Sequence, residues 1–514
     1  MRRLFFLFLL YQLGLSEVWS QTFIVDNLKY SVVQSEDFSV RVSFPDSMNS
    51  DGALMLDSLF IPAFVEHGGH SYRVLEVEEE GFCGCDDVRF VSVGKGIRRI
   101  GNRAFRNCLG LESVQIPCSV EMIGECIFSG CINLSSIMVE EGNPVYDSRE
   151  TCNAIVKSDG DILVAGCKET RIPSSVTNIG SKAFHRQHVL RHIEIPEGVK
   201  CISYKAFEDC SQMATVSLPE SLKEISGDAF KGCESLKSIY IPKGVESIEY
   251  NPFTHCPSLL EIEVDKKNKS YHSGSSNSII DTKTGMLISG CSKTFIHSSV
   301  SKIEMFAFQG ASRLSEIFIP HHVTKIEAGA FADCSNLVLI SVDKKNALYN
   351  DGDGGNCIIE KLTGTLVCGG CATKIPSNVQ TIGVMAFRGI ETPATLIIPE
   401  NVKTIKRTAF FGCDNLKHLI VEGSPVIHVQ AFAGCKQLEN VILGEGMEQI
   451  PPAAFANCTS LKDVHIPETV KEIAVDAFYG CQFVPYKKRT REIFKSQLIN
   501  ISGQTDQRRA TEKR

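Results

Sequence analysis

A repeat of about 23 residues recurs along nearly the whole chain, and it restricts the fold more than any other feature. Residues 206–249 contain it twice: Ala-Phe, a Cys three residues later, a Leu or Met three residues after that, a short alternating run ending in Pro, and Val-x-x-Ile. A fixed period of this length is typical of a solenoid, because each unit becomes stable only by stacking on its neighbours. The sequence therefore predicts one elongated solenoid domain.

Each repeat predicts one coil with a strand and a tight turn. In runs such as Ile239–Ile241 the outer residues should point into the core and the middle residue should point outward. The Pro that follows should end the strand, since it cannot donate to a ladder. The Ala-Phe segment is too short for a helix, so we expect a single helical or 3-10 turn. The fold class is thus a β-rich solenoid of about sixteen short parallel strands.

Aligning the chain on the Phe of the repeat shows three long steps of 55 or 56 residues among the steps of about 23. Each long step holds one ordinary and one enlarged coil. The enlarged coils carry two apolar runs around a Gly turn, within residues 152–167, 277–291 and 357–371. We expect a β-hairpin in each, outside the main sheet and acting as a local module. The aligned residues are Phe82, Phe105, Phe128, Phe184, Phe207, Phe230, Phe253, Phe308, Phe331, Phe387, Phe410, Phe432, Phe455 and Phe478.

The chain ends differ from the repeat. Residues 1–20 have two Arg, an apolar run and a small-residue exit, which predicts a secretory signal peptide. Residues 21–59 read as alternating strands and predict a β-rich N-terminal cap over the solenoid of residues 60–484. Residues 485–514 form a basic C-terminal tail, in which only REIFKSQLI could make a short capping helix. No later segment reaches the roughly 20 apolar residues of a membrane span.

The motif IGxxAFxxCxxLxxIxIPxxVxxI resembles the leucine-rich repeats of the Bacteroides surface protein A (BspA) type, over about residues 60–483. The resemblance implies a leucine-rich-repeat solenoid of the α/β class, secreted to the envelope or cell surface. For some members it also implies adhesion to host proteins. It does not imply a shared ligand, because the repeat is scaffold and function lies in the residues between its fixed positions.

Of the 21 cysteines, eleven lie three residues after the repeat Phe and form what we call the Cys ladder. The repeats without this Cys carry Gln187, Ala311 and Ile390, and each directly follows an enlarged coil. This pattern favours buried, reduced thiols that pack against the previous coil. Cross-linking of some, including disulfides within two hairpins, is the alternative. The ladder comprises Cys85, Cys108, Cys131, Cys210, Cys233, Cys256, Cys334, Cys413, Cys435, Cys458 and Cys481.

Motifs for chemistry are few. Cys368 and Cys371 have CxxC spacing, but no second pair stands at metal-ligand spacing, so packing is the favoured interpretation. No nucleophile elbow, P-loop or HExxH is present. We expect neither an enzyme nor a cofactor or metal site. The formal net charge of −7 argues against nucleic acid as a partner.

The outward residue of each strand predicts where a partner binds. This position is mostly polar in the first half of the chain and carries large apolar residues in the second, with Glu263, Lys374 and His465 beside them. An exposed apolar stripe of this kind is typical of an interaction surface. β-propensity alone is the other explanation. The predicted binding residues are Tyr240, Phe295, Phe318, Ile397, Ile420 and Ile442.

These features indicate a secreted or cell-surface repeat protein that mediates binding or adhesion through its sheet face, to a host extracellular protein or a glycan. The alternative is a structural envelope scaffold that self-associates laterally. No membrane span is expected in either case.

Overall fold

The computed structural model describes residues 22–34, 37–45, 57–352 and 354–482. The signal peptide expected at residues 1–20 and the basic tail at 485–514 lie outside these ranges. The chain forms two compact units. The first comprises Met1–Leu236 and Pro242–Phe253, and the second comprises Lys237–Ile241 and Thr254–Arg514. Each is described by itself below.

An ordinary coil contains a longer strand, a two-residue strand and a tight turn. In β9 (Ser113–Ile116), Val114 and Ile116 are buried and Gln115 is exposed, as the alternation predicts. Pro117 follows directly. Because proline has no backbone N–H to donate to the ladder, the strand ends there, as predicted. The β-rich repeat solenoid expected from the sequence is confirmed. We call the outward side of the longer strands the strand face.

The Ala-Phe segment forms a single turn and no helix. The amide of Cys210 donates to the carbonyl of Phe207, 3.2 Å away. Lys205 and Asp209, two residues before and after Phe207, both have positive φ, and this left-handed backbone prevents the turn from continuing as a helix. Within the described ranges, the one helix is the 3-10 helix η3 (Arg149–Thr151).

The rings of successive repeats stack in the core. Phe207 lies with its ring centroid 5.0 Å from that of Phe184 and 5.2 Å from that of Phe230, with nearly parallel planes. All three side chains are fully buried. Stacked aromatic pairs at this spacing add stability beyond the area that they bury.

The Cys ladder has a hydrogen-bonding role that the sequence did not reveal. In nine coils the Sγ atom donates to the carbonyl oxygen of the Phe one coil earlier, at 2.9 to 3.4 Å. Most of these carbonyls also accept from the backbone amide three residues later, so the thiol is a second donor to them in the core. All 21 cysteines fall within the described ranges, and none forms a disulfide bond. The donors are Cys108, Cys131, Cys210, Cys233, Cys334, Cys413, Cys435, Cys458 and Cys481.

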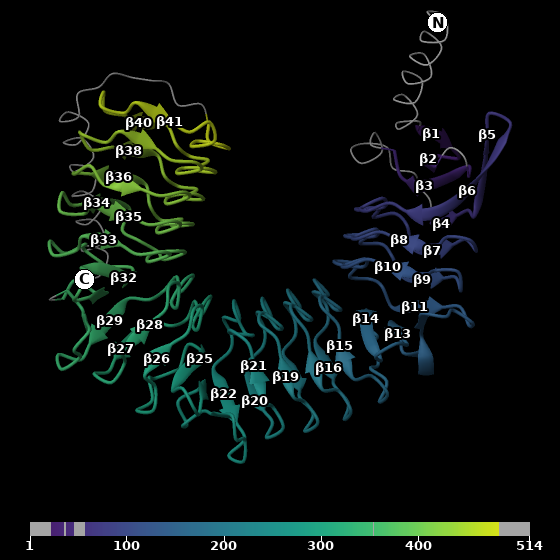
Figure 1. The fold of residues 1–514 in the computed structure, drawn as a ribbon, viewed down its shortest axis with the longest axis horizontal. Helices are drawn as coiled ribbons and strands as arrows, with labels where there is room; N and C mark the ends of the chain where they lie inside the picture. Colours follow the sequence, from purple (N-terminus) through teal and green to yellow (C-terminus); the bar gives the residue numbers. More distant parts are fainter. Residues whose placement is uncertain (1–21, 35–36, 46–56, 353, 483–514) are drawn as a thin grey trace, which may run out of the picture. The chain divides into compact units, whose positions relative to one another are not determined.

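In the first unit, four sheets contain all the strands described there, and the order of strands within each follows the stacking of the coils (Figure 1). The first sheet joins the antiparallel strands of the N-terminal segment to the two-residue strands of the first coils: β1 (Thr22–Val25), β2 (Leu28–Gln34), β3 (Ser39–Ser43), β5 (Phe64–His67), β6 (His70–Val77), β8 (Arg99–Ile100) and β10 (Met122–Ile123). The strand face has β4 (Ser58–Ile61), β7 (Phe90–Val93), β9 and β11 (Ser136–Val139), then β16 (His192–Glu194) and β18 (Thr215–Ser217). The remaining sheet has β12 (Tyr146–Asp147), β13 (Ala154–Lys157), β14 (Ile162–Gly166), β15 (Asn178–Ile179), β17 (Cys201–Ile202), β19 (Glu224–Ile225) and β21 (Ser247–Ile248).

The second unit repeats this arrangement. Its strand face has β20 (Ser238–Ile241) with β22 (Glu261–Val264), then β27 (Glu316–Ile319) with β29 (Leu339–Val342), then β34 (Thr395–Ile398), β36 (His418–Val421), β38 (Asn440–Ile442) and β40 (Asp463–His465). The other sheets have β23 (Tyr271–His272), β24 (Ser278–Asp281), β25 (Met286–Gly290), β26 (Lys302–Ile303) and β28 (Lys325–Ile326); β30 (Tyr349–Asn350), β31 (Cys357–Glu360), β32 (Thr365–Gly369), β33 (Thr381–Ile382), β35 (Thr404–Ile405) and β37 (Val426–Ile427); and β39 (Gln449–Ile450) with β41 (Glu472–Ile473).

Each enlarged coil contains the predicted antiparallel hairpin: β13 with β14, β24 with β25, and β31 with β32. The hairpins are not peripheral modules, however. The second strand of each pairs in parallel with the next two-residue strand, and Ile279, Ile280 and Leu287 are fully buried. The hairpins are therefore part of the core, which corrects the expectation that they are local additions.

The strand face is also not one continuous sheet. The residues that the repeat aligns with its strands in the three enlarged coils, around Arg171, Phe295 and Lys374, form no strand. The ladder on this face is therefore interrupted at each enlarged coil.

Candidate functional site

Four of the six predicted binding residues are exposed in the second unit: Tyr240, Phe318 and Ile397 on the strand face, and Phe295 in a segment that forms no strand. The exposed fractions are 44% for Tyr240, 55% for Phe295, 52% for Phe318 and 40% for Ile397. The Tyr240 hydroxyl donates to Asp265 Oδ2, 2.6 Å away, so its ring is held in place above β20. For these residues the predicted outward direction is confirmed.

Ile420 and Ile442 differ, because both are fully buried. They lie in register with Ile397 across β34, β36 and β38, so they occupy outward positions as predicted. Together they form an apolar cluster separate from the main core of this unit. The expectation that they are exposed is wrong.

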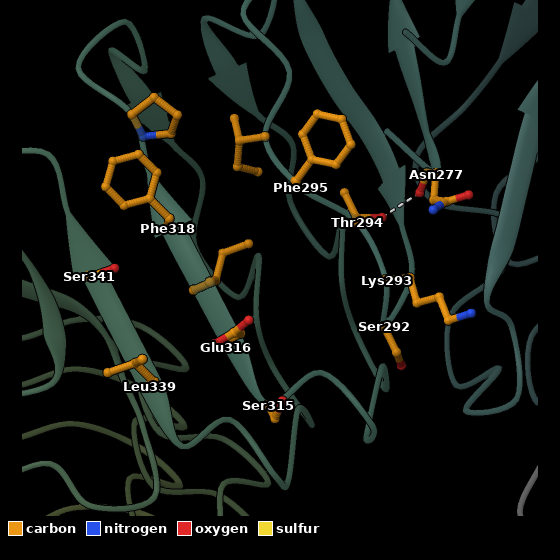
Figure 2. A pocket seen from close by; sticks show the side chains of 13 residues that line it. Asn277, Ser292, Lys293, Thr294, Phe295, Ser315, Glu316, Phe318, Leu339 and Ser341 are labelled. Atoms are coloured by element: carbon orange, nitrogen blue, oxygen red, sulfur yellow. Dashed lines mark hydrogen bonds between the residues drawn. The ribbon is translucent and has the colours of Figure 1, made fainter. Parts of the chain in front are cut away.

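Phe295 and Phe318 line a groove of about 770 Å³. Figure 2 shows the two rings toward one end of the groove and Ser292 and Ser315 toward the other. Leu339, on β29, adds a third exposed apolar side chain. A volume of this size lies in the range of specific binding sites.

The groove exists because residues 292–297 do not continue the strand ladder. Thr294 Oγ1 accepts from the amide of Cys291 and donates to the carbonyl of Asn277 at the start of the hairpin (Figure 2). The equivalent Thr170 and Thr373 make the same contacts to Asn153 and Asn356 in the other enlarged coils. These bonds hold the coil against its hairpin instead of against the neighbouring strand.

As a result, the groove lies between residues 292–297 and β27. Ile296 and Ile317 point into the core, yet both contribute to the lining of the groove. β27 pairs with β29 on one side only. The polar part of the lining comes from Asn277, Ser292, Lys293, Thr294, Ser315, Glu316 and Ser341.

Sequence reasoning missed Leu339 because it considered only the central residue of each strand. A residue two positions earlier points to the same face, so the period of two would have found it. The same rule identifies Phe90 in the first unit, which is 39% exposed, and Phe60 is 64% exposed on β4. Large apolar residues on the strand face are therefore not confined to the second half of the chain.

A row of hydrogen-bonded polar side chains links the Ala-Phe turns of neighbouring coils in the first unit. Ser129 Oγ lies 2.7 Å from His185 Nδ1, and His185 Nε2 lies 3.3 Å from Glu208 Oε2. Glu208 is buried and also accepts from Lys205 at 2.8 Å and Lys231 at 3.0 Å. Burial raises the pKa of Glu208, but these partners outweigh it and hold the pKa far below its ordinary value.

The order Ser, His, Glu is that of a hydrolase triad, but the charge state differs. Burial lowers the pKa of His185, while hydrogen bonds to Cys126 and Glu208 raise it to about 9 overall. The imidazole is thus already protonated at neutral pH and cannot take a proton from Ser129. The cavity beside them, of about 10 Å³, holds no more than one water molecule. We interpret this group as a charge network that joins adjacent coils.

Cys368 and Cys371, the two cysteines with CxxC spacing, have different surroundings. The Cys371 thiol donates to the carbonyl of Ser335, 3.0 Å away, and burial raises the pKa of Cys368. In the part of the chain that the structure describes, no group of three or more His, Cys, Asp or Glu residues is placed to hold a metal ion.

With the geometry established, comparison with known proteins assigns the family. The model of the BspA type leucine rich repeat region matches six copies in residues 71–150, 165–279, 286–362 and 371–484, which is more than half of the chain. The chain belongs to this family. The resemblance drawn from the repeat motif is therefore confirmed. Among curated proteins, none matches the chain.

Several solved structures are similar to the chain at low identity. A leucine rich cell surface protein from Faecalibacterium prausnitzii is 23% identical, covers 88% of this chain and 96% of its own, and has a TM-score of 0.40. A leucine-rich repeat protein from Bacteroides ovatus is 24% identical, covers 89% and 92%, and has a TM-score of 0.33. The pneumococcal vaccine antigen PcpA is 18% identical, covers 91% and 99%, and has a TM-score of 0.35.

None of the described residues belongs to a helix long and apolar enough to cross a membrane.

Proposed function

We propose that this BspA-type protein is exported and binds a protein partner in the groove between residues 292–297 and β27. The observation that carries the proposal is the groove itself. It places Phe295, Phe318 and Leu339 half exposed beside hydroxyl, amide and charged side chains. Exposed aromatic anchors with polar groups at their rim are typical of protein interfaces.

The edge of β27 favours a protein over a glycan. β27 has its ladder partner β29 on one side, and on the other side the described chain carries no strand. Such an edge offers backbone N–H and C=O groups to an added strand. A partner with an extended segment would combine these bonds with burial of Phe318 and Leu339 on the outward side.

The test measures binding of the full chain to arrays of extended peptides and of glycans. Replacing Phe295 and Phe318 with Ser should weaken peptide binding by about tenfold or more, since each buried aromatic contributes on the order of 1–2 kcal/mol. The matched control is Met138→Ser, because Met138 is 53% exposed on β11 of the first unit. It should leave binding unchanged.

Binding to glycans instead of peptides would contradict the choice of a protein partner. Concentration-dependent assembly in light scattering that the two Phe substitutions abolish would contradict the proposal. It would support the alternative of a scaffold that self-associates laterally. Export is checked separately by N-terminal sequencing of the secreted protein, which should begin at Gln21.

A further inference from the structure

The edge at which the longer strands of the second unit end carries a row of basic side chains. Two exposed lysines follow β22 after one Asp, and two more follow β29 in the same way. The two coils between them place histidines at this edge, at the end of residues 292–297 and after β27. We call this row the basic stripe. It comprises Lys266, Lys267, His297, His321, His322, Lys344 and Lys345.

The basic stripe begins where the groove ends. Residues 292–297 and β27 form the walls of the groove. His297 is the last residue of the first wall, and Pro320 and His321 directly follow the second. β27 and β29 pair in register to their last residues, so Pro320 and Asp343, which follow them, lie side by side. A segment that is bound along β27 and extends past Pro320 would therefore meet the stripe.

The imidazoles at this edge contact one another from coil to coil. The rings of His272, on β23, and His297 lie with centroids 5.7 Å apart, and they contact Ser299 Oγ at 3.3 and 2.8 Å. His322 Nε2 lies 3.4 Å from the carbonyl oxygen of His297. The rings of His321 and His322 have centroids 5.4 Å apart. The histidines therefore form one connected cluster between the coils that carry the lysine pairs.

The carboxylates at this edge are already engaged. Asp265 and Asp343 each accept from the backbone amide two residues later, at 2.6 and 2.9 Å. The second oxygen of Asp265 accepts from the Tyr240 hydroxyl at 2.6 Å, and that of Asp343 lies 3.1 Å from His321 Nδ1. Within the described ranges, none of the four lysines of the stripe lies within ion-pair distance of a carboxylate. Their charges are therefore open to a partner.

We propose that the partner segment bound in the groove carries acidic residues next to its apolar part, and that these acidic residues lie along the basic stripe. The inference rests on the proposed function, because it names the partner of the same site. Four lysines and two engaged carboxylates give this edge a local excess of positive charge, in a chain whose formal net charge is −7. Opposite charge at the end of an apolar contact favours the matching partner and fixes its direction.

The histidines make this attraction depend on pH. Burial lowers the pKa of His272, and the neighbouring His297 lowers it further. Burial also lowers the pKa of His322, with His321 adding to the effect and Asp343 opposing it. Both imidazoles are therefore largely neutral at pH 7, and a bound carboxylate would raise both pKa values.

Affinity for an acidic segment should rise as the pH falls below about 6.5, because protonation then adds positive charge beside it. The carboxylates of the segment stay ionised down to about pH 5. The charged groups on the segments next to the histidines are Asp265, Lys266, Lys267, Lys269, Asp281, Lys283, Asp343, Lys344 and Lys345.

The test screens the full chain against arrays of extended peptides and of glycans, and then compares variants. The peptides that bind should carry Asp or Glu next to an apolar run. Lys266→Gln with Lys344→Gln should weaken their binding by about fivefold or more, since two charge contacts are removed. The matched control is Lys237→Gln with Lys417→Gln. It removes the same charge from two exposed lysines at the opposite end of the longer strands and should leave binding unchanged.

The outcomes separate this inference from the proposed function. If Phe295→Ser with Phe318→Ser abolishes peptide binding and the lysine variant does not weaken it, the inference is overturned and the proposed function stands. If the lysine variant abolishes binding and the Phe variant leaves it intact, both are overturned, because the partner does not use the groove. Binding of acidic glycans instead of peptides, or no binding to either array, would overturn both as well.

A second measurement follows the affinity of one bound acidic peptide against pH. Its affinity should rise about threefold or more between pH 7.5 and 5.5, whereas the same peptide with Asn and Gln in place of Asp and Glu should show no rise. His272→Gln with His322→Gln should remove the rise. Sodium chloride at 0.5 M should weaken the acidic peptide more than the neutral one, since salt screens exposed charges. An affinity that changes with neither pH nor salt would overturn the inference.

Discussion

The side-chain amide of Gln187 donates a hydrogen bond to the carbonyl oxygen of Phe128, 3.1 Å away. In ordinary coils a ladder Cys makes this bond, as Cys131 does to the Phe105 carbonyl at 2.9 Å. Gln187 follows an enlarged coil, at a repeat position where Cys is absent. A longer amide side chain therefore takes over the bond, so this position supplies a second donor to a carbonyl that also accepts from the amide of Cys131.

The first prediction concerns that bond. Replacing Cys210 with Ala should destabilise the protein by about 1 kcal/mol, because the Phe184 carbonyl loses the bond from the thiol but keeps the one from the amide of Gln187. Replacing Cys210 with Ser should cost less, since the hydroxyl still donates. Denaturant unfolding of both variants provides the comparison, and equal losses would show that the thiol contributes only packing.

The second prediction concerns thiol reactivity. Burial raises the pKa of the Cys210 and Cys368 thiols, so both should resist alkylation at pH 8 in the native protein. Cys83 and Cys118 are only half-buried and should react first. After denaturation without reductant, at least the eleven ladder thiols should be counted as free. Disulfide-linked ladder peptides in mass spectra would refute this.

The third prediction concerns pH. The folded-state pKa of His185 is raised to about 9 from an ordinary 6.5, so its contribution to stability is complete below pH 6.5 and is lost as the pH rises to 9. At about 1.4 kcal/mol per pKa unit, the loss is on the order of 3 kcal/mol. Unfolding midpoints between pH 6 and 9.5 should fall in the native protein and stay flatter in His185→Gln. His192→Gln is the matched control, because His192 is exposed.

At the acid end, Glu208 has the opposite dependence. Its pKa is lowered in the folded protein, so its contribution is present above its ordinary pKa of 4.5 and is lost as the pH falls below that value. Glu208→Gln should therefore reduce the acid sensitivity of the protein while lowering its stability at neutral pH. A variant as stable as the native protein at pH 7 would show that the network contributes nothing.

The fourth prediction separates two isoleucines at equivalent positions. Ile420→Ser should cost about 2–4 kcal/mol, because it leaves a cavity and buries a hydroxyl. Ile397→Ser should cost less than about 1 kcal/mol, because Ile397 is 40% exposed. Thermal and denaturant unfolding give both values. Similar costs would show that the outer side of β36 is not covered.

The fifth prediction concerns the hairpins. Shortening residues 268–289 to an ordinary return should destabilise the protein by more than about 4 kcal/mol, because Ile279, Ile280 and Leu287 are lost from the core. Leu362→Ser is the control, since Leu362 is 90% exposed at another hairpin turn and should change stability little. Unaltered cooperative unfolding of the shortened protein would show that the hairpins are local modules and not part of the core.

The sequence by itself determined the coil. Phe207, Cys210 and Ile225 are all fully buried, as their place in the repeat predicts. The reason is physical: every coil meets nearly the same neighbours, so one period of about 23 residues specifies the same environment each time. The outward direction of Tyr240 and Phe318 followed from the two-residue period of a strand.

The tertiary structure alone decided which of these outward residues are accessible and where the groove forms. Ile397 and Ile420 occupy the same position in the repeat, yet only Ile397 is exposed, so the repeat position does not by itself determine exposure. The groove likewise depends on Thr294 bonding the carbonyl of Asn277, a contact between an enlarged coil and its own hairpin. A periodic pattern specifies contacts between equivalent positions, whereas these features arise where the period is broken.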